Sequence, residues 1–156
     1  MNTLKEEPII SDNGVTLKAD VGKRVVAFLI DCVVAGVAGI LVAILVPSLS
    51  GLAGAAYFLV RDGLELKYMN RRSFGKHVMN LQCVRRDGRL MDLETSMRRN
   101  WMLALSGLAS LTMFGSLRWL LSFAGTVFLV YEAYRVLTRS DGRRWGDELA
   151  GTQVVD

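Results

Sequence analysis

The stretch that decides the fold is residues 25–46, VVAFLIDCVVAGVAGILVAILV, a run of 22 residues whose only charged side chain is Asp31. As a helix rising about 1.5 Å per residue it would be ~33 Å long, which matches the ~30 Å hydrocarbon core of a bilayer. A buried core helix is the alternative, but a soluble chain of 156 residues rarely contains such a run. The stretch therefore predicts a membrane-spanning helix.

Residues 1–23 are polar and mixed in charge, so they do not contain the short apolar core of a signal peptide. The apolar run that follows is too long for a signal peptide and has no small-residue cleavage site at its end. We expect a cytoplasmic N-terminal segment followed by a retained first span. The two cysteines, Cys32 and Cys83, have no zinc-site or disulfide spacing and are predicted to be unpaired thiols.

Three further apolar stretches follow, and short turns at 47–50 and 113–116 join the four stretches in two pairs. The second stretch is uncharged only as far as Val60, so to span it must continue through Arg61 and Asp62. We predict an all-α membrane domain over residues 24–138, made of two antiparallel hairpins. Its helices are expected at about 25–46, 50–68, 97–112 and 117–137. Small residues such as Gly51 and Gly54 favour close helix packing, although glycine is common in membrane spans anyway.

Lysine and arginine are distributed unevenly between the two ends of these hairpins. Four precede the first span, ten lie from Arg61 to Arg99, and four lie from Arg135 to Arg144, whereas the two short turns hold only Arg118. The positive-inside rule then places both termini, the loop 69–96 and the tail 139–156 in the cytoplasm. We expect a multi-pass protein of the bacterial cytoplasmic (inner) membrane.

The loop and the tail predict a small β-rich element on the cytoplasmic side. Residues 79–84 alternate apolar and polar side chains and are followed by Asp87-Gly88, a pattern typical of a β-hairpin. Residues 152–155 are predicted to form an extra strand.

Ionisable residues at membrane depth are unfavourable, and here they share one cytoplasmic layer. Asp31 and Asp62 each lie ~9 Å from the cytoplasmic boundary at helical rise. We expect a structural ion-pair network in which Asp31 pairs with Arg24 or Arg61, because a cluster open to one side only cannot conduct by itself. A cation or proton site built on Asp31 is the alternative. The layer is predicted to contain Arg24, Asp31, Arg61, Asp62, Glu65, Glu132 and Arg135.

No set of catalytic, metal-binding or cofactor-binding residues can be assembled from the sequence. Gly75-Lys76 lacks the remaining residues of a phosphate loop, and the single histidine, His77, stands beside a lysine. We therefore expect no enzyme activity, no cofactor and no nucleic-acid partner. The basic excess of the central loop either reflects topology alone or binds anionic lipid head groups.

Five motifs in order make the chain resemble the RDD family of membrane proteins from residue 22 onward. They are Arg24 with Ala27, Phe28 and Asp31 (R-x-x-A-F-x-x-D), residues 73–76 with Gly75 and Lys76 (T-L-G-K), residues 84–88 with Asp87 and Gly88 (V-x-x-x-D-G in the family, one residue shorter here), Arg99, and residues 143–155 with Asp147 (R-x-x-x-D-x-x-A-G-T-x-V-V). The resemblance implies that Arg24, Asp31 and Asp147 are the arginine and aspartates after which the family is named. One departure is Gly146, where the family often has histidine.

The resemblance implies a fold and a topology more than a function. Cation/proton antiport has been attributed to some members, and others look like accessory membrane modules. Our leading hypothesis is a non-enzymatic module acting in envelope assembly, maintenance or partner binding, with the lipid bilayer, other membrane proteins or a homo-oligomer as partners. The alternative is a small antiporter for monovalent cations that uses Asp31, as an oligomer. An enzyme acting on lipid ranks third.

Overall fold

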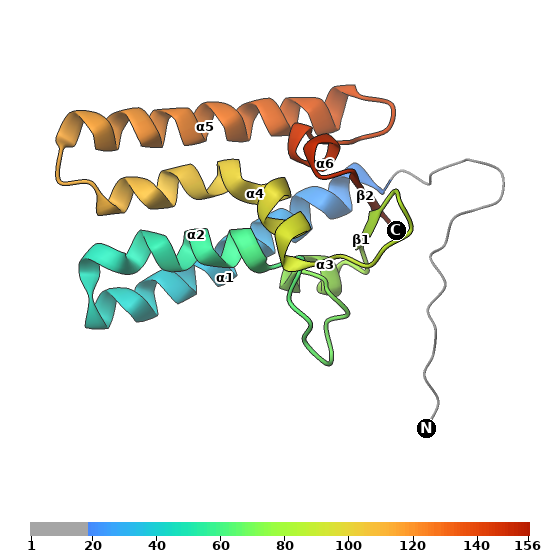
Figure 1. The fold of residues 1–156 in the computed structure, drawn as a ribbon, viewed down its shortest axis with the longest axis horizontal. Helices are drawn as coiled ribbons and strands as arrows, with labels where there is room; N and C mark the ends of the chain where they lie inside the picture. The colour runs from blue at the N-terminus through green and yellow to red at the C-terminus, as the bar shows by residue number, and fades with distance from the viewer. Residues whose placement is uncertain (1–18) are drawn as a thin grey trace.

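Four long helices dominate the structure, a computed structural model that describes residues 19–156 (Figure 1). They form two antiparallel hairpins, as predicted, whose turns lie at one end of the bundle (Figure 1). Short 3₁₀ helices adjoin these turns. The elements are α1 (Val21–Leu45), η1 (Pro47–Leu49), α2 (Ser50–Val60), α4 (Leu93–Leu108), η2 (Ala109–Leu111) and α5 (Gly115–Thr138).

The centre of the bundle is the contact between α2 and α4, with α1 packed on α2 and α5 packed on α4. A Cβ added to Gly107 would lie 2.5 Å from the Cβ of Ala55, and one added to Gly51 would lie 2.7 Å from the Ser110 hydroxyl. Larger side chains there would force the helices apart. A Cβ on Gly36 would meet nothing within 4 Å, so that glycine is not needed for packing within this chain.

Two of the described helices, α1 and α5, are long and apolar enough to cross a membrane. Within the apolar 18-residue segment of each helix, only 17% is buried in α1 and 22% in α5. The core helix of a soluble protein would be mostly buried. The outward-facing side chains of α1 are large and aliphatic, a surface that suits lipid rather than water. They include Leu29, Val33, Val37, Ile40, Leu41 and Ile44.

The prediction that the second helix continues to about residue 68 is wrong. α2 ends at Val60. The chain then passes closely over the start of α4, where a Cβ on Gly63 would lie 2.5 Å from the carbonyl oxygen of Asp92. Arg61 and Asp62 consequently lie at the end of the helix and turn into the protein, where both are buried. Side chains of other elements pair with both charges. The helix therefore does not have to continue beyond them.

The predicted starts of the first and third helices are each four residues late. α1 begins at Val21, because the Asp20 carboxylate accepts a hydrogen bond of 2.8 Å from the backbone N–H of Lys23. α4 begins at Leu93, because Asp92 accepts a bond of 2.7 Å from Thr95 N–H. Capping residues start a helix before its apolar periodicity does, so a prediction from hydropathy begins too late.

The end of the bundle opposite the hairpin turns is covered by four short elements, which we call the cap (Figure 1). They are α3 (Phe74–Val78), β1 (Gln82–Arg85), α6 (Trp145–Leu149) and β2 (Thr152–Val155). β1 and β2 pair antiparallel, with Cys83 opposite Val154. The strand predicted in the tail is confirmed, but the predicted hairpin at Asp87-Gly88 is wrong. β1 pairs with the tail, and the residues after the turn lead into α4.

The cap packs on the first turns of α1. Leu81 and Val154 form a small apolar core with Ala19 and Ala27. The backbone of α3 approaches α1 so closely that a Cβ on Gly75 would lie 1.9 Å from the carbonyl oxygen of Ala27. Only glycine permits this approach, which brings the cap within reach of the charged side chains of the bundle.

Candidate functional site

Arg99, in the second turn of α4, joins groups from three other parts of the chain. Its Nε donates to Asp147 Oδ1 at 2.6 Å, and its Nη1 donates to Asp62 Oδ2 at 2.9 Å. The same Nη1 lies 2.6 Å from Cys83 Sγ. Arg99 is 2% exposed, so its charge is carried inside the protein and depends on these carboxylates. It therefore links α4 to the residue after α2, to β1 and to α6.

Asp147, in α6, is fully buried and is surrounded by arginines. Besides Arg99, it accepts hydrogen bonds from Arg24 Nη2 at 3.2 Å and from Arg144 Nη2 at 3.1 Å. It also accepts the backbone N–H of Arg144 at 3.0 Å, which caps α6. Burial by itself would raise the pKa of Asp147, but Arg144, Arg99 and Arg24 outweigh burial and hold the pKa well below 3.8. The carboxylate is thus ionised at any physiological pH.

Asp62, directly after α2, is the second fully buried carboxylate. It accepts from Lys76 Nζ on α3, from Arg99 at 2.9 Å and from Asn100 Nδ2 at 3.3 Å. Burial would raise the pKa of Asp62, but Lys76 and Arg99 hold that pKa well below its usual range. Burial lowers the pKa of Lys76 to about 8. Asp62 opposes that shift, and the neighbouring cations Arg99 and Arg61 reinforce it.

Asp31, in α1, is the third buried carboxylate of the site. Its Oδ2 lies 2.7 Å from Arg61 Nη1, which confirms one of the two partners expected from the sequence. Its Oδ1 accepts from the Tyr57 hydroxyl at 2.7 Å and from the backbone N–H of Gly75 at 2.8 Å. The carboxylate is 1% exposed, so it cannot bind bulk water. One ion pair and two neutral donors replace its hydrogen bonds with water. The other expected partner, Arg24, turns instead to Asp147.

These contacts form one buried cluster, which we call the charged network. Every one of its carboxylates binds side-chain or backbone groups from at least two different parts of the chain, so the network holds the cap to the helices. Removing one partner from such a cluster would leave the remaining charge unpaired in a low-dielectric interior. The network consists of Arg24, Asp31, Arg61, Asp62, Lys76, Arg99, Arg144 and Asp147.

Glu132 and Arg135 of α5 lie beside the network and position α6. Glu132 is 4% exposed and accepts the backbone N–H groups of Trp145 at 3.0 Å and Gly146 at 2.9 Å. These are the first N–H groups of α6, which have no partner inside the helix. Arg135 Nη2 forms an ion pair of 2.8 Å with Glu148. Both residues thus attach the cap to α5.

Three residues expected in or near the site lie outside the network. Glu65 is exposed and pairs with Arg71 at 3.2 Å, so its place in the predicted layer is wrong. The cause is the early end of α2, which puts Glu65 in a surface loop. Asp87 and Gly88 form the exposed turn after β1, where Gly88 has a positive φ of 75°. Asp87 pairs there with Arg85 at 2.8 Å.

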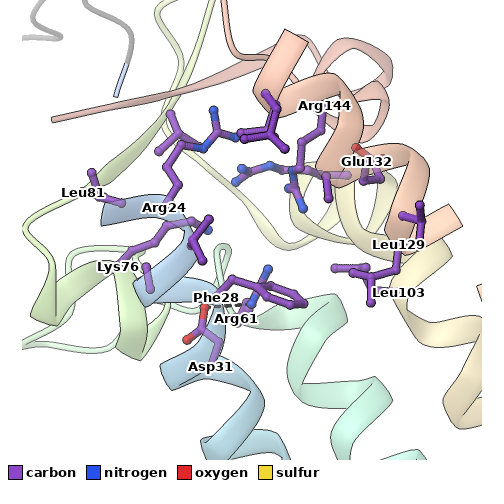
Figure 2. Close-up of a pocket in the computed structure, with 18 residues that line it drawn as sticks. Arg24, Phe28, Asp31, Arg61, Lys76, Leu81, Leu103, Leu129, Glu132 and Arg144 are labelled. Carbon is purple, nitrogen blue, oxygen red and sulfur yellow. Dashed lines mark hydrogen bonds and ion pairs between the residues drawn. The ribbon is translucent and has the colours of Figure 1, made fainter. Parts of the chain in front are cut away.

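A cavity of about 420 Å³ borders the charged network between α1 and α5 (Figure 2). Asp31, Lys76 and Glu132 lie on its wall, and Leu103 and Leu129 cover another side (Figure 2). We call it the lateral pocket. No ligand-binding role follows from its volume alone, but it is bordered by both a charged interior and apolar helix faces.

Comparison with family models matches residues 18–151 to the model described as the RDD family. The chain belongs to the RDD family. The match covers both hairpins and the cap up to the start of β2, and it confirms the resemblance drawn from the five sequence motifs. Comparison with curated proteins and with solved structures finds no match.

Within this RDD protein, two of the three residues taken to give the family its name lie together. Arg24 contacts Asp147 at 3.2 Å, and Asp31 is bound by Arg61 on the other side of the network. Gly146 replaces the histidine frequent in the family, and a Cβ there would lie 2.1 Å from the carbonyl oxygen of Arg99. The backbone approach of α6 to α4 therefore leaves no room for a side chain at this position.

The sequence alone did not identify several residues that belong to the charged network or bind it. Lys76 and Arg99 were noted only as motif residues, and Tyr57 and Arg144 were not singled out. Arg99 and Asn100 offered one signal: they stand together just before an apolar helical run, where burial of a polar face is expected to require partners. Tyr57 offered none, because a tyrosine in a span is usual near an interface.

Proposed function

We propose that this RDD protein is a non-enzymatic, multi-pass module of the bacterial cytoplasmic membrane. In this arrangement α1, α2, α4 and α5 cross the bilayer, and the cap faces the cytoplasm. The uneven distribution of basic residues supports this orientation, because the segments 61–99 and 135–144 lie at the cap end and only Arg118, in the first turn of α5, lies near the hairpin turns. α2 has 11 residues and is about 16 Å long, so its crossing requires a locally thinned bilayer.

The observation that carries the proposal is the complete pairing of the three network aspartates. Asp31, Asp62 and Asp147 are each bound by a cation and at least one further donor. Such pairing suits a rigid connection between a membrane bundle and a cap. A carboxylate used as a base or as an exchangeable ion site would instead have to release a buried arginine or lysine. We infer that the module presents its cap to other proteins of the envelope.

The alternative, a monovalent cation/proton antiporter, is favoured by one observation. Asp31 lies on the wall of the lateral pocket, which would allow a small ion to approach it. Against this, Arg61 lies 2.7 Å from the same carboxylate and already neutralises its charge. Transport sites also usually lie near the midplane of the bilayer, whereas Asp31 lies at the cap end.

Reconstituted vesicles separate the two functions. Purified full-length protein is inserted into vesicles containing a pH-sensitive dye, and sodium or potassium is added around neutral pH. We expect no cation-driven proton movement. Asp31→Asn, which removes the charge and preserves the shape, is compared with Asp87→Asn in the exposed turn. A wild-type flux that is lost in Asp31→Asn and kept in Asp87→Asn would contradict the module proposal and support the antiporter.

Mass spectrometry of the vesicle lipids after incubation tests the third hypothesis, an enzyme acting on lipid. Any product of lipid cleavage or transfer contradicts the non-enzymatic proposal.

A further inference from the structure

The lateral pocket lies where the two hairpins diverge. α1 packs mainly on α2 and α3, and α5 packs mainly on α4, so α1 and α5 form opposite walls of a gap at the cap end. The outer part of these walls is exposed: Val25 of α1 is 49% exposed, and Val130 and Leu137 of α5 are 63% and 66% exposed. A molecule in the surrounding membrane can therefore enter from the side.

The lining of the pocket has two chemically distinct parts (Figure 2). Its inner part consists of charged side chains, namely five arginine and lysine side chains of the charged network together with Asp31 and Glu132. Its outer part is apolar and comes chiefly from α5, with one aromatic ring from α1. The apolar lining residues are Val25, Ala27, Phe28, Leu81, Leu103, Leu129, Val130, Ala133, Val136, Leu137 and Val154.

One buried donor on this lining has no acceptor. Arg61 is 4% exposed, and its Nε makes no hydrogen bond within the described residues. Its nearest ion-pair oxygen, Asp62 Oδ2, lies at 4.0 Å, which is too far for a hydrogen bond. A buried N–H without a hydrogen bond is unfavourable, so the position is expected to have a partner in the functional protein. Because the Nε atom is itself buried, an anionic oxygen in the pocket would become its partner after a small turn of the Arg61 side chain.

The charges around the pocket do not balance. Two carboxylates on the wall, Asp31 and Glu132, and two directly behind it, Asp62 and Asp147, give four negative charges. The lining contains five basic side chains, which leaves one positive charge in excess. They are Arg24, Arg61, Lys76, Arg99 and Arg144. A single negative charge entering the pocket would neutralise the cluster.

We propose that the lateral pocket binds one anionic phospholipid, with its phosphodiester against the basic inner lining and an acyl chain between α1 and α5. A phosphodiester carries one negative charge, which matches the excess, and its oxygens are good acceptors for arginine. The apolar outer lining and the lateral opening favour a lipid over free phosphate, which would leave the apolar walls uncovered. A second copy of the chain would cover those walls but would bring no anion to Arg61.

Native mass spectrometry of the full-length protein in detergent tests this. Equal amounts of phosphatidylglycerol and phosphatidylcholine are added, and we expect one retained phosphatidylglycerol per chain, preferred about tenfold over phosphatidylcholine, because the choline group of the latter would add a positive charge to a pocket that already has one in excess. Ala133→Trp fills the mouth of the pocket from an exposed position on α5 without touching the network, and it should abolish retention. Ala56→Trp, at an exposed position of α2 that does not line the pocket, is the matched control and should retain the lipid.

Each contrary result has a definite meaning. Equal retention of the two lipids would refute the charge argument, and retention by Ala133→Trp would refute the location. Displacement of phosphatidylglycerol by inorganic phosphate would assign the site to a free anion and overturn the lipid proposal. A lipid-free dimer that Ala133→Trp disrupts would assign the pocket to a second copy of the chain.

If Ala133→Trp does not fold, Val130→Trp on the same wall takes its place. Arg61→Lys keeps the charge but removes the unpartnered Nε, and it should weaken retention about tenfold.

Discussion

Arg99 and Asp147 are 48 residues apart in the chain, and a hydrogen bond of 2.6 Å between Arg99 Nε and Asp147 Oδ1 joins them inside the protein. The contact connects α4 of the bundle to α6 of the cap. Because α6 has only five residues, it is too short to form by itself and relies on such contacts for its position. The arginine and aspartate thus help to hold the cap on the bundle.

Asp147→Asn should therefore reduce the free energy of unfolding strongly. The amide leaves Arg24, Arg99 and Arg144 without their common counter-charge, and breaking a buried pair on one side costs about 3–5 kcal/mol. Denaturant unfolding in detergent measures the loss. Asp87→Asn is the control, because Asp87 pairs with arginines at the exposed surface, where water and salt screen the pairs, and the change should cost little stability. Similar losses for the two variants would contradict a structural role for Asp147.

A double-mutant cycle tests the pair of Asp31 and Arg61. Asp31→Ala leaves a buried guanidinium unpaired and Arg61→Met leaves a buried carboxylate, so each single change should be severely destabilising. The double variant removes both charges and should be more stable than the sum of the single losses predicts. Thermal unfolding of the four proteins in one detergent gives the coupling energy. Additive losses would mean that the 2.7 Å ion pair is not energetically important.

The network also predicts a loss of stability in acid. The pKa values of Asp62 and Asp147 lie well below 3.8 in the folded protein because nearby lysine and arginine side chains outweigh the effect of burial. A carboxylate whose pKa is lower in the folded state stabilises that state fully at pH values above its unfolded-state pKa. This stabilisation is lost as the pH falls below about 3.8. Unfolding should therefore become progressively easier as the pH falls from about 5 toward the lowered folded-state pKa values.

The fluorescence of Trp145 can report this transition. Trp145 of α6 packs edge-on against Trp101 of α4, with ring centroids 6.4 Å apart, so release of the cap separates the rings. Trp119→Phe removes an exposed tryptophan that would obscure the signal. Asp147→Asn starts from a lower stability but should lose less of it in this pH range. An equal acid dependence in the presence and absence of Asp147 would be inconsistent with its lowered pKa.

Much of the fold could be predicted from the sequence because bilayer thickness sets a length that apolar runs must reach. This is why α1 and α5 were predicted to within four residues at each end. The end of α2 could not be predicted in the same way. Its position depends on the approach of Gly63 to Asp92, 29 residues later, and no local pattern encodes that contact.

The candidate site was predicted in part for a similar reason. Asp31 and Asp62 stood out because charges in apolar segments are unfavourable and therefore conspicuous. Lys76 and Arg99 did not stand out, because they occur among many other basic residues of the central loop. Their burial depends on the pairing of β1 with β2 and on the close contact of Gly75 with α1, which are both long-range.

The orientation proposed for the chain predicts the accessibility of single cysteines. Variants are made in a background without Cys32 and Cys83, and a membrane-impermeant thiol reagent is applied to intact cells. Cysteines at Ser48 and Gly115, in the hairpin turns, should react from outside, and those at Gly88 and Gly142, in the cap region, only after lysis. Gly14, expected inside, lies outside the described residues. Labelling of position 88 in intact cells would reverse the topology.

Glycine substitutions test the close approach of the cap to the bundle. A Cβ on Gly146 would lie 2.1 Å from Arg99 O, and one on Gly75 would lie 1.9 Å from Ala27 O. Both obstacles are backbone atoms of long helices, which cannot move aside as a flexible side chain can. Gly146→Ala and Gly75→Ala should each displace the cap and lower the unfolding temperature, and Gly75→Ala should also break the bond from its N–H to Asp31.

Gly36→Ala is the matched control on α1, because a Cβ there meets nothing within 4 Å. Alanine is also the better helix former by about 1 kcal/mol, so this variant should be as stable as the wild type or more stable. Gly146→His, which introduces the residue frequent in the family, should be worse than Gly146→Ala because the larger side chain meets the same carbonyl. If Gly146→His were as stable as the wild type, α6 could not lie as close to α4 as the Arg99–Asp147 bond of 2.6 Å requires.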